Sequence, residues 1–287
     1  MAIDYDKLIN IALPDVHQSY SSRDTLLYAL SLGLGGGPMN RRELPFVYEK
    51  GQRCLPSYGA VLGRQGFWIR DMDTGVDWVK LVHTEHQLIL HKPLPVEARL
   101  VSQQRVADLI DRGEGRGAVI VWERKIHDAD SGEALCTVVQ TMLARGDGGF
   151  GGPPGQLPPP PTTPDREPDM VVERKTADNA ALLYRLNGDM NPLHADPEVA
   201  RKAGFERPIL HGLATWGIAA TAVLDRVCDF DSDAIASVYG RFTAPVMPGE
   251  TLCTRIWVEG GEAHYTVEVV ERGVLAIKNG LVGLRNL

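Results

Sequence analysis

The chain has 287 residues, of which 44% are apolar and 23% are charged, a composition typical of a folded globular protein. Its formal net charge of −7 argues against a general nucleic-acid-binding protein but is compatible with a local basic patch for an anionic ligand. No Cys-x-x-Cys pair occurs, so neither a disulfide framework nor a zinc ribbon is expected from Cys54, Cys136, Cys228 and Cys253.

Targeting signals are not apparent at either end of the sequence. The start, Met-Ala-Ile-Asp-Tyr-Asp-Lys, lacks the basic region and apolar stretch of a signal peptide. No apolar run reaches the roughly 20 residues that span a bilayer. The last three residues, Arg-Asn-Leu, differ from the peroxisomal address Ser-Lys-Leu. We therefore expect a cytoplasmic protein that acts on neither membranes nor nucleic acids.

The first half of the chain is predicted to begin with helices and to end in strands. An amphipathic helical piece is followed by a loop and then by a longer apolar helix. Segments rich in Val, Ile, Thr and Tyr follow, a composition typical of strands. These predicted strands are residues 79–90, 98–107, 117–126 and 133–144.

A segment dominated by glycine and proline, residues 146–169, divides the chain into parts of similar size. Proline fixes φ and lacks an amide donor, so we predict an extended connector between two folded units. The predicted domains are residues 1–145 and 170–287, joined by this connector.

The second half repeats the order of the first. Asp196 and Pro197 are typical of an N-cap and a first helical position, and Gly204 suits the end of that helix. A second helix, predicted over residues 212–223, is small and apolar on nearly every face and should be buried. Strands are predicted at residues 236–242, 251–258, 263–270 and 274–284.

Short matches between the halves indicate a duplication. Leu-Leu-Tyr-x-Leu occurs at residues 26–30 and again at 182–186, an offset of 156. Two further resemblances, near residues 55 and 95, recur at offsets of 158 and 153. Three matches in the same order at nearly the same offset predict two related units. Each would pack an antiparallel sheet around a long buried helix, so the predicted fold is α+β, a tandem pair of hotdog domains.

The residues best suited to catalysis lie close together in the second half. Asp189, Asn191 and His194 fall within six residues, and His211 with Gly212 opens the predicted buried helix. Asn191 suits an N-cap and the proline after it a first helical position. An acid, a base and an amide at the positive end of a helix can together move protons beside a carbonyl group.

The first half lacks these groups at the corresponding positions. At the offset of 156, Asp189 falls on Gly33, Asn191 on Gly35 and His194 on Pro38. The glycine-rich run there follows a helical pattern rather than a strand, so it does not predict a nucleotide-binding loop. We predict one active site per chain, in the second half.

The segment Gly-Asp-Met-Asn-Pro-Leu-His at residues 188–194 resembles the signature of the R-specific enoyl-CoA hydratases, the hydratase 2 or MaoC-like family. The resemblance extends over nearly the whole chain. It is carried further by Tyr-Ser-Ser-Arg-Asp at 20–24, His-Lys-Pro-Leu-Pro at 91–95, Arg-Gly-Asp-Gly-Gly-Phe-Gly-Gly at 145–152 and Arg-Pro-Ile-Leu-His-Gly-Leu at 207–213.

The resemblance implies a double hotdog that adds water, without a cofactor, to a trans-2-enoyl-CoA to give the (3R)-3-hydroxyacyl-CoA. By match to the motif, Asp189 and His194 hold and activate the water and deliver a proton to the α-carbon. Asn191 positions that pair or the thioester, and the amide of Gly212 binds the carbonyl oxygen. The family also implies fatty-acid or related acyl-CoA metabolism and a homodimer, and the first half would accommodate the acyl chain.

Three more residues are candidates for substrate binding. Arg207 could meet the phosphates of coenzyme A, although a solvated charge is equally consistent with its position. His211 is expected to fix the start of the buried helix rather than to transfer protons. Phe150, in a flexible glycine-rich segment, is a candidate lid over the acyl chain.

A metal site near His83, Glu85, His86 and His91 is not favoured. On a regular strand His83 and Glu85 would face one side and His86 the other, so they could not share an ion. Two other functions remain open: a hotdog acyl-CoA thioesterase, which needs a carboxylate but not this motif, and a non-catalytic subunit that binds acyl-CoA.

Overall fold

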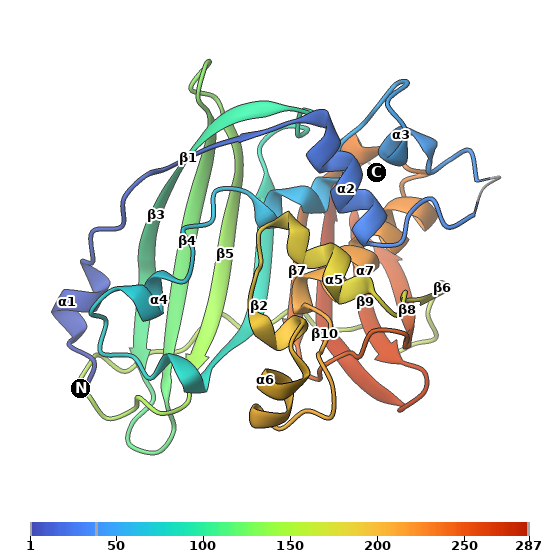
Figure 1. The fold of residues 1–287 in the computed structure, drawn as a ribbon. Helices are drawn as coiled ribbons and strands as arrows, with labels where there is room; N and C mark the ends of the chain where they lie inside the picture. The colour runs from blue at the N-terminus through green and yellow to red at the C-terminus, as the bar shows by residue number, and fades with distance from the viewer. Residues whose placement is uncertain (1, 38–39, 286–287) are drawn as a thin grey trace.

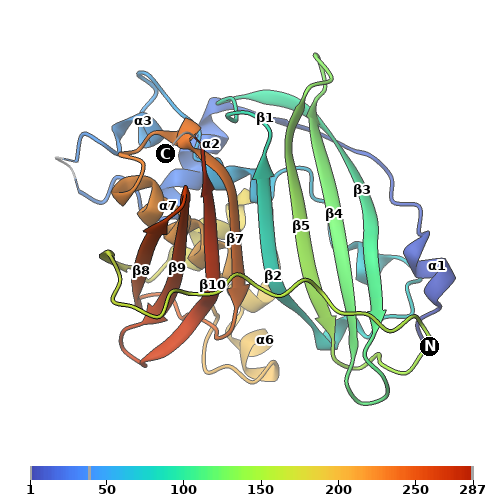
Figure 2. The ribbon, with the colours of Figure 1, turned by 180° about the vertical axis from the view of Figure 1, so that it is seen from behind.

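A computed structural model describes residues 2–37 and 40–285 of the chain. Pro38, which the duplication aligns with His194, lies outside the described residues. Figures 1 and 2 show one broad antiparallel sheet with the helices gathered mainly over one of its faces. Its strands are β1 (Val16–Tyr20), β2 (Leu81–Leu90), β3 (Ala98–Asp111), β4 (Ala118–Asp128), β5 (Ala134–Ala144), β6 (Met170–Lys175), β7 (Ile235–Phe242), β8 (Thr251–Glu259), β9 (Glu262–Val269) and β10 (Val274–Leu284).

The helical elements are short, with the exception of α2 and α7. The α-helices are α1 (Tyr5–Ile9), α2 (Ser22–Ser31), α3 (Leu44–Val47), α4 (Trp68–Asp71), α5 (Ala180–Tyr184), α6 (Pro197–Lys202) and α7 (Gly212–Arg226). The 3₁₀ turns are η1 (Pro56–Val61), η2 (Trp78–Lys80), η3 (Arg185–Asn187), η4 (Pro192–His194) and η5 (Ser232–Ala234). None of the helices in the described part of the chain is long and apolar enough to cross a membrane.

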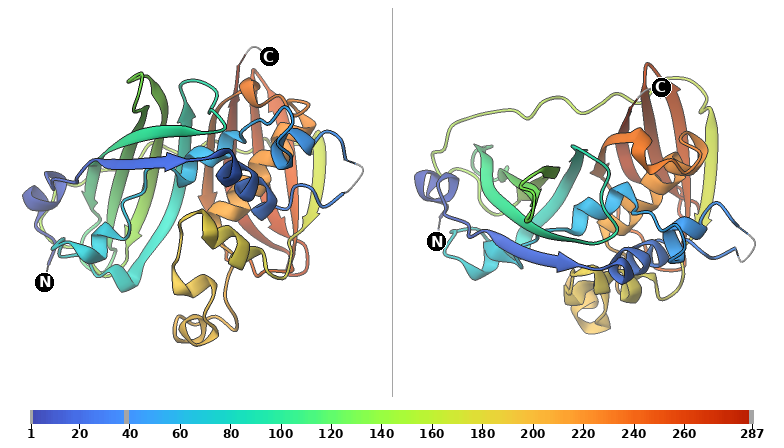
Figure 3. Two further views of the ribbon diagram at one scale, coloured as in Figure 1. Left: turned by 45° about the horizontal axis from the view of Figure 1, so that its top comes forward. Right: turned by 90° about the horizontal axis from the view of Figure 1, so that it is seen from above.

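The strand order of the second half mirrors that of the first about the centre of the sheet. It runs β1-β3-β4-β5-β2 and continues β7-β10-β9-β8-β6, so each half contributes five strands in an equivalent arrangement. The halves join where β2 pairs with β7, with His86 opposite Gly240 and Leu88 opposite Val238. Viewed from above, the sheet is not one flat layer, because the strands of each half curve separately (Figure 3). This is the double hotdog architecture that the sequence predicts.

The eight strands predicted from the sequence are confirmed, with boundaries that differ by a few residues at most. The two edge strands, β1 and β6, were not predicted. They are short, and their inner and outer residues alternate without a long apolar run. Edge strands that carry polar side chains resemble loops in composition, because only one side of such a strand is paired.

The prediction of a long central helix is correct for the second half and wrong for the first. Helix α7 has 15 residues, is buried from Leu213 to Leu224, and packs against β7, β8, β9 and β10. The corresponding element of the first half is η1, a six-residue 3₁₀ helix. It lies between α7 and strands β2 and β5.

Two glycines explain why η1 remains short and close to the sheet. A Cβ at Gly59 would lie 2.8 Å from Leu88 Cδ1, so only glycine permits this approach. Gly63 ends the segment with φ of +59°, and a Cβ there would lie 2.4 Å from Ser102 Cβ. The chain therefore turns away after about two turns of 3₁₀ helix, where α7 continues.

The connector crosses the outer face of the sheet between the two halves, as Figure 2 shows. No helix or strand lies between Ala144 and Met170 in the described chain. Leu157 packs beside Ile110, Val119 and Val121. The carbonyl oxygen of Pro161 accepts a hydrogen bond of 2.8 Å from the side-chain amide (Nδ2) of Asn279. These contacts hold the connector on both halves.

Candidate active site

Asp189, Asn191 and His194 lie on a compact turn that the local sequence determines. Gly188 has φ of +100°, a left-handed conformation that ends η3 and redirects the chain just before Asp189. Asn191 is the N-cap of η4, accepting a hydrogen bond of 3.0 Å from the amide of Leu193. The amide of Asn191 donates to Asp189 Oδ1 at 3.3 Å. The predicted N-cap and the predicted helical position of Pro192 are confirmed.

His194 is held in one tautomer. Its Nδ1 lies 2.8 Å from the carbonyl oxygen of Ile209, which can only accept, so Nδ1 carries the proton. The Nε2 atom is therefore free to accept a proton. Burial lowers the pKa of His194, which keeps the ring neutral near pH 7.

His211 links the turn to the start of α7. Its ring stacks on that of His194, with centroids 3.7 Å apart and an interplanar angle of 26°. Its Nε2 donates to the backbone carbonyl oxygen of Asp189 at 3.2 Å. Burial is the main reason that the pKa of His211 falls to about 3, so this ring is also neutral. His211 thus positions both Asp189 and His194.

The carboxylate of Asp189 forms an ion pair with a side chain from the other half of the molecule. Arg64 Nη1 lies 3.1 Å from Asp189 Oδ2, and both side chains are about three-quarters buried, at 22% and 24% exposure. Burial alone would raise the pKa of Asp189, but the charge of Arg64, with contributions from protonated His211 and His194, lowers it to about 2. Both histidines are neutral near pH 7, so Arg64 is the cation that keeps Asp189 ionised there.

The amino end of α7 points toward this group of residues. The first amide of the helix with a backbone partner is that of Ala214, which donates to the carbonyl of His211. Among the described residues, the amide of Gly212 has no such partner, as expected for the first turn. This amide lies at the amino end of the 15-residue helix, where the helix dipole is positive. A Cβ at Gly212 would lie 3.3 Å from Phe242 Cε1, so an aromatic ring covers this position.

Two of the predicted substrate-binding residues lie apart from this group. Arg207 is exposed on the loop between α6 and α7 and has no ion pair among the described residues. Phe150 packs partly buried on a second core that includes Trp68, Ile120 and Met142. The structure therefore places Phe150 in the first half, and none of the contacts of the described residues joins it to Asp189 or His194.

The expected orientation of the histidines on β2 is wrong. A bulge interrupts the pairing of β2 with β5 between His83 and Glu85, which turns His83 to the same side as His86. Their ring centroids are 5.3 Å apart. Glu85 faces the other side and lies 3.7 Å from Arg241. His83 and His86 therefore belong to the interior of the first half, near Phe242.

Arg64 and Tyr184 were not identified as functional candidates from the sequence. Arg64 follows η1 and meets a residue 125 positions later, and no local pattern indicates such a contact. Tyr184 belongs to the Leu-Leu-Tyr-x-Leu segment that occurs in both halves, and a residue common to both halves suggests a structural role rather than a catalytic one. It is fully buried, 4.9 Å from the ring centroid of His211, and its hydroxyl has no hydrogen-bond partner among the described residues.

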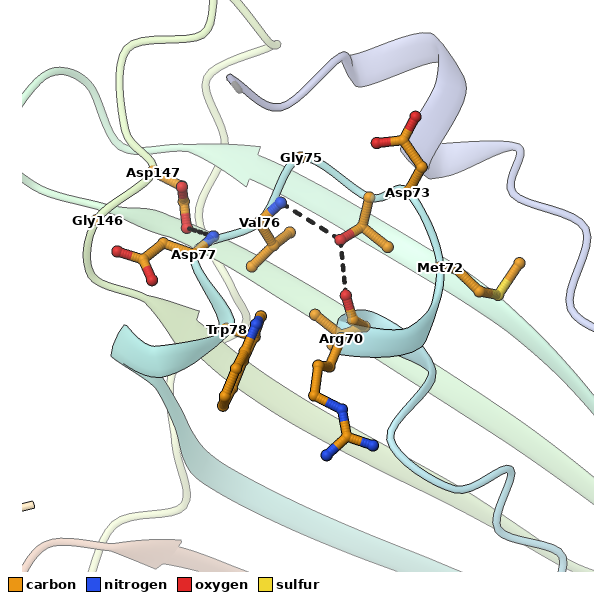
Figure 4. A pocket seen from close by; sticks show the side chains of 11 residues that line it. Arg70, Met72, Asp73, Gly75, Val76, Asp77, Trp78, Gly146 and Asp147 are labelled. Carbon is orange, nitrogen blue, oxygen red and sulfur yellow. Dashed lines mark hydrogen bonds between the residues drawn. The ribbon is translucent and has the colours of Figure 1, made fainter.

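A surface hollow of about 550 Å³ lies far from these residues, between the loop after α4 and the end of β5 (Figure 4). Thr74 accepts a hydrogen bond from the amide of Val76 and donates to the carbonyl of Ile69, which fixes the loop. The carboxylates of Asp73, Asp77 and Asp147 line the hollow. They disfavour an anionic ligand such as coenzyme A, so the candidate active site remains the group around Asp189.

Comparison with known proteins places each half in a described family. Residues 18–146 match the MFE-2 hydratase 2 N-terminal domain, and residues 160–280 match the MaoC like domain. A 3-hydroxyacyl-thioester dehydratase Y from Mycobacterium tuberculosis is 40% identical, over 94% of this chain and 92% of the relative. A peroxisomal enoyl-CoA hydratase 2 from Arabidopsis thaliana is 36% identical, over 98% of this chain and 96% of the relative.

A solved structure extends the likeness to three dimensions. The MaoC-like dehydratase from Phytophthora capsici superimposes with a TM-score of 0.85 at 29% identity and covers 99% of both chains. The sequence matches of both halves and the shared double fold agree with the resemblance carried by residues 188–194. The chain belongs to the hydratase 2 family of MaoC-like dehydratases.

Proposed function

We propose that this protein catalyses the reversible, (3R)-specific hydration of trans-2-enoyl-CoA to (3R)-3-hydroxyacyl-CoA in fatty-acid or related acyl-CoA metabolism. The observation that carries the proposal is the pair of proton acceptors beside a helix start. Asp189 is ionised through Arg64, and His194 presents an unprotonated Nε2 because Nδ1 donates to Ile209. The relatives named above are a dehydratase and a hydratase acting on acyl thioesters.

In the proposed reaction, Asp189 and His194 hold one water molecule between them. As the water oxygen bonds to the β-carbon, one of its protons passes to this pair, and the pair returns a proton to the α-carbon. The overall change is the addition of one water across the double bond. Negative charge grows on the thioester oxygen during this step, and we propose that the amide of Gly212 stabilises it.

The remaining residues support this pair. His211 holds both the Asp189 carbonyl and the His194 ring, and Asn191 fixes the turn through its cap. We propose that Arg207, on the exposed loop before α7, meets the phosphates of coenzyme A. The first half carries no acid and base at the corresponding positions, so the proposed enzyme has one site per chain.

The first test is a direct assay of hydration with two variants. Asp189→Asn and His194→Ala should each lower kcat for an enoyl-CoA by about 10²–10⁴, because each removes a proton-transfer group. Glu198→Gln, on the exposed face of α6, is the matched control and should retain full activity. Chiral analysis of the product should give the 3R isomer. Variants at Asp189 and His194 that turn over as fast as the wild type would contradict the proposal.

The same assay separates the rival functions. Release of free coenzyme A from a saturated acyl-CoA would identify a thioesterase, whereas loss of the enoyl-thioester absorbance identifies a hydratase. Binding of acyl-CoA without either reaction would indicate a non-catalytic subunit.

The assembly and the location in the cell are further parts of the proposal. We propose a homodimer in addition to the internal pair of domains, which light scattering at micromolar concentration would test. A cytoplasmic location stays a prediction, whereas the Arabidopsis relative is named as a peroxisomal enzyme. Imaging of a tagged chain in its own cell would decide between the two.

A further inference from the structure

The inner face of the first half of the sheet carries polar side chains where a hotdog core is normally apolar. Trp122 on β4 pairs with Gln140 on β5, and Gln140 pairs with His86 on β2, so these three side chains share a face. Arg124, two residues beyond Trp122, points to the same side and pairs with Gln104 of β3. We call these five residues the inner polar face: His86, Gln104, Trp122, Arg124 and Gln140.

These side chains are buried without the partners that buried polar groups normally have. Arg124 and His86 are fully buried, and Gln140 is 6% exposed. Arg124 Nε and Nη1, both ring nitrogens of His86 and Gln140 Oε1 have no hydrogen-bond partner among the described residues. Native proteins leave only a few such atoms per hundred residues. Their concentration on one face indicates a binding surface for oxygen-bearing groups.

The charge of Arg124 is the strongest part of this evidence. Its guanidinium donates one hydrogen bond, from Nη2 to the carbonyl oxygen of Ala60 at 2.9 Å, and lies 5.0 Å from the centroid of the Trp122 ring. Burial lowers its pKa to about 9, and Arg64 contributes in the same direction, so Arg124 remains a cation near pH 7. In the described chain, Arg124 forms no ion pair. A buried cation without a counter-ion is costly unless an anion joins it.

The inner polar face lies next to the candidate active site. Phe242 is in contact with the Cβ position of Gly212 at 3.3 Å, and its ring centroid lies 5.0 Å from that of His83. The ring of His83 in turn lies 5.3 Å from His86. Arg124 donates a hydrogen bond to Ala60 in the last turn of η1, and Arg64, three residues after the end of η1, pairs with Asp189. Contacts through Phe242, His83 and His86 therefore join this face to the start of α7.

We propose that the inner polar face is a subsite for a carboxylate carried by the acyl chain of the substrate. Arg124 is its counter-ion, and two further donors complete its hydrogen bonds: the ring N–H of His86 and the indole N–H of Trp122, whose Nε1 also has no partner among the described residues. The chemical class of substrate is thus an enoyl thioester with a second, distal carboxylate. This inference rests on the proposed hydratase function and specifies its substrate. Burial keeps His86 neutral, so its ring can donate one hydrogen bond and accept another.

The test compares pairs of trans-2-enoyl-CoAs that have equal chain length and end in either a methyl group or a carboxylate. Several lengths are used, and kcat/KM is measured for each. At the length that reaches Arg124, the wild type should favour the carboxylate by about 10-fold or more. Preference for the methyl-ended substrate at every length would overturn the proposal.

The variant Arg124→Met keeps the volume of the side chain and removes the charge. The ratio of the two kcat/KM values should fall by about 10- to 100-fold, the usual effect of one charge-assisted hydrogen-bonded contact. The matched control is Lys125→Met, the next residue on β4, whose exposed side chain faces outward and whose loss should leave the ratio unchanged. An unchanged ratio in folded Arg124→Met would overturn the proposal. If that variant does not fold, His86→Phe, which keeps an aromatic ring and removes the N–H donor, is measured in its place with the same criterion.

Failure of the proposed reaction can be told apart from failure of this subsite. If the wild type hydrates no enoyl-CoA, calorimetry measures the binding of saturated acyl-CoAs with and without a terminal carboxylate. Tighter binding of the carboxylated ligand that is lost in Arg124→Met supports the subsite even then. Equal binding of the two ligands by the wild type would overturn it.

Discussion

Removal of the Arg64 charge should move the acid side of the pH–rate profile to higher pH. In the variant Arg64→Met, Asp189 loses the cation 3.1 Å from its carboxylate, while its burial is retained. At an effective dielectric constant of about 20, two charges this close interact by roughly 5 kcal/mol before desolvation is counted. The net effect of a neighbouring arginine on a carboxyl pKa is about 1–3 pH units, equivalent to about 1.4–4 kcal/mol.

The sign of the change follows from the folded-state pKa of Asp189. This pKa, about 2, lies below the value of about 3.9 expected in an unfolded chain, so the ionised carboxylate stabilises the fold above that pH. That stabilisation is lost as the pH falls from about 4 to 2. Without Arg64 the folded pKa rises, the stabilisation shrinks, and protonation begins at higher pH. The pKa of His194, which Arg64 also lowers, should rise with it.

The assay is kcat/KM for an enoyl-CoA between about pH 4 and 8, with thermal unfolding measured at each pH. The wild type should hold its activity further into the acid range than Arg64→Met, whose acid limb should lie about 1–3 pH units higher. Arg105→Met is the matched control, because Arg105 pairs with Glu123 on the outer face and is largely exposed. An acid limb that stays in place, or moves to lower pH, would refute the assignment of Arg64 as the residue that keeps Asp189 ionised.

Further predictions concern the helix start, the turn and the cap of α6. Gly212→Pro suits a first helical position but removes the amide, so kcat should fall by about 10²–10³, whereas Gly212→Ala, which keeps the amide, should lose much less. His211→Phe keeps an aromatic ring on His194 but loses the bond to Asp189, and kcat should fall while the KM for enoyl-CoA stays nearly constant. Asp196→Ala removes an N-cap that accepts from two amides of α6 and should lower the free energy of unfolding by about 1 kcal/mol in urea titrations. In the last case, an unchanged unfolding midpoint would contradict the assigned cap.

Local patterns were sufficient for most of the fold because the relevant forces act between near neighbours in the sequence. The alternation of β-branched residues located eight strands, and Asp196 with Pro197 located the start of α6. The short turn at Asn191 and Pro192 was predicted for the same reason, since an Asn cap and a proline each constrain their own residue.

The features that escaped prediction depend on contacts between distant parts of the chain. The apolar run near residue 58 suggests a helix, but the approach of Gly59 to Leu88 and Cys136 keeps η1 at six residues. The bulge beside Thr84 reverses the side on which His83 lies, and simple alternation cannot indicate it. The ion pair between Arg64 and Asp189 joins the two halves, so neither half shows it alone.

The short η1 connects these unpredicted features to function. A central helix as long as α7 would lie over the inner face of β2, β4 and β5 and would bury that face in protein side chains. Because η1 ends at Val61 and the chain turns at Gly63, Arg64 can reach Asp189. The carbonyl oxygen of Ala60 is also left to accept the hydrogen bond from Arg124. Loss of the helix therefore does two things at once: it supplies the cation of the candidate active site and leaves the inner polar face to a ligand. On this reasoning the first half does more than provide space for an acyl chain, since it sets both the ionisation of Asp189 and the chemistry of the substrate that can bind.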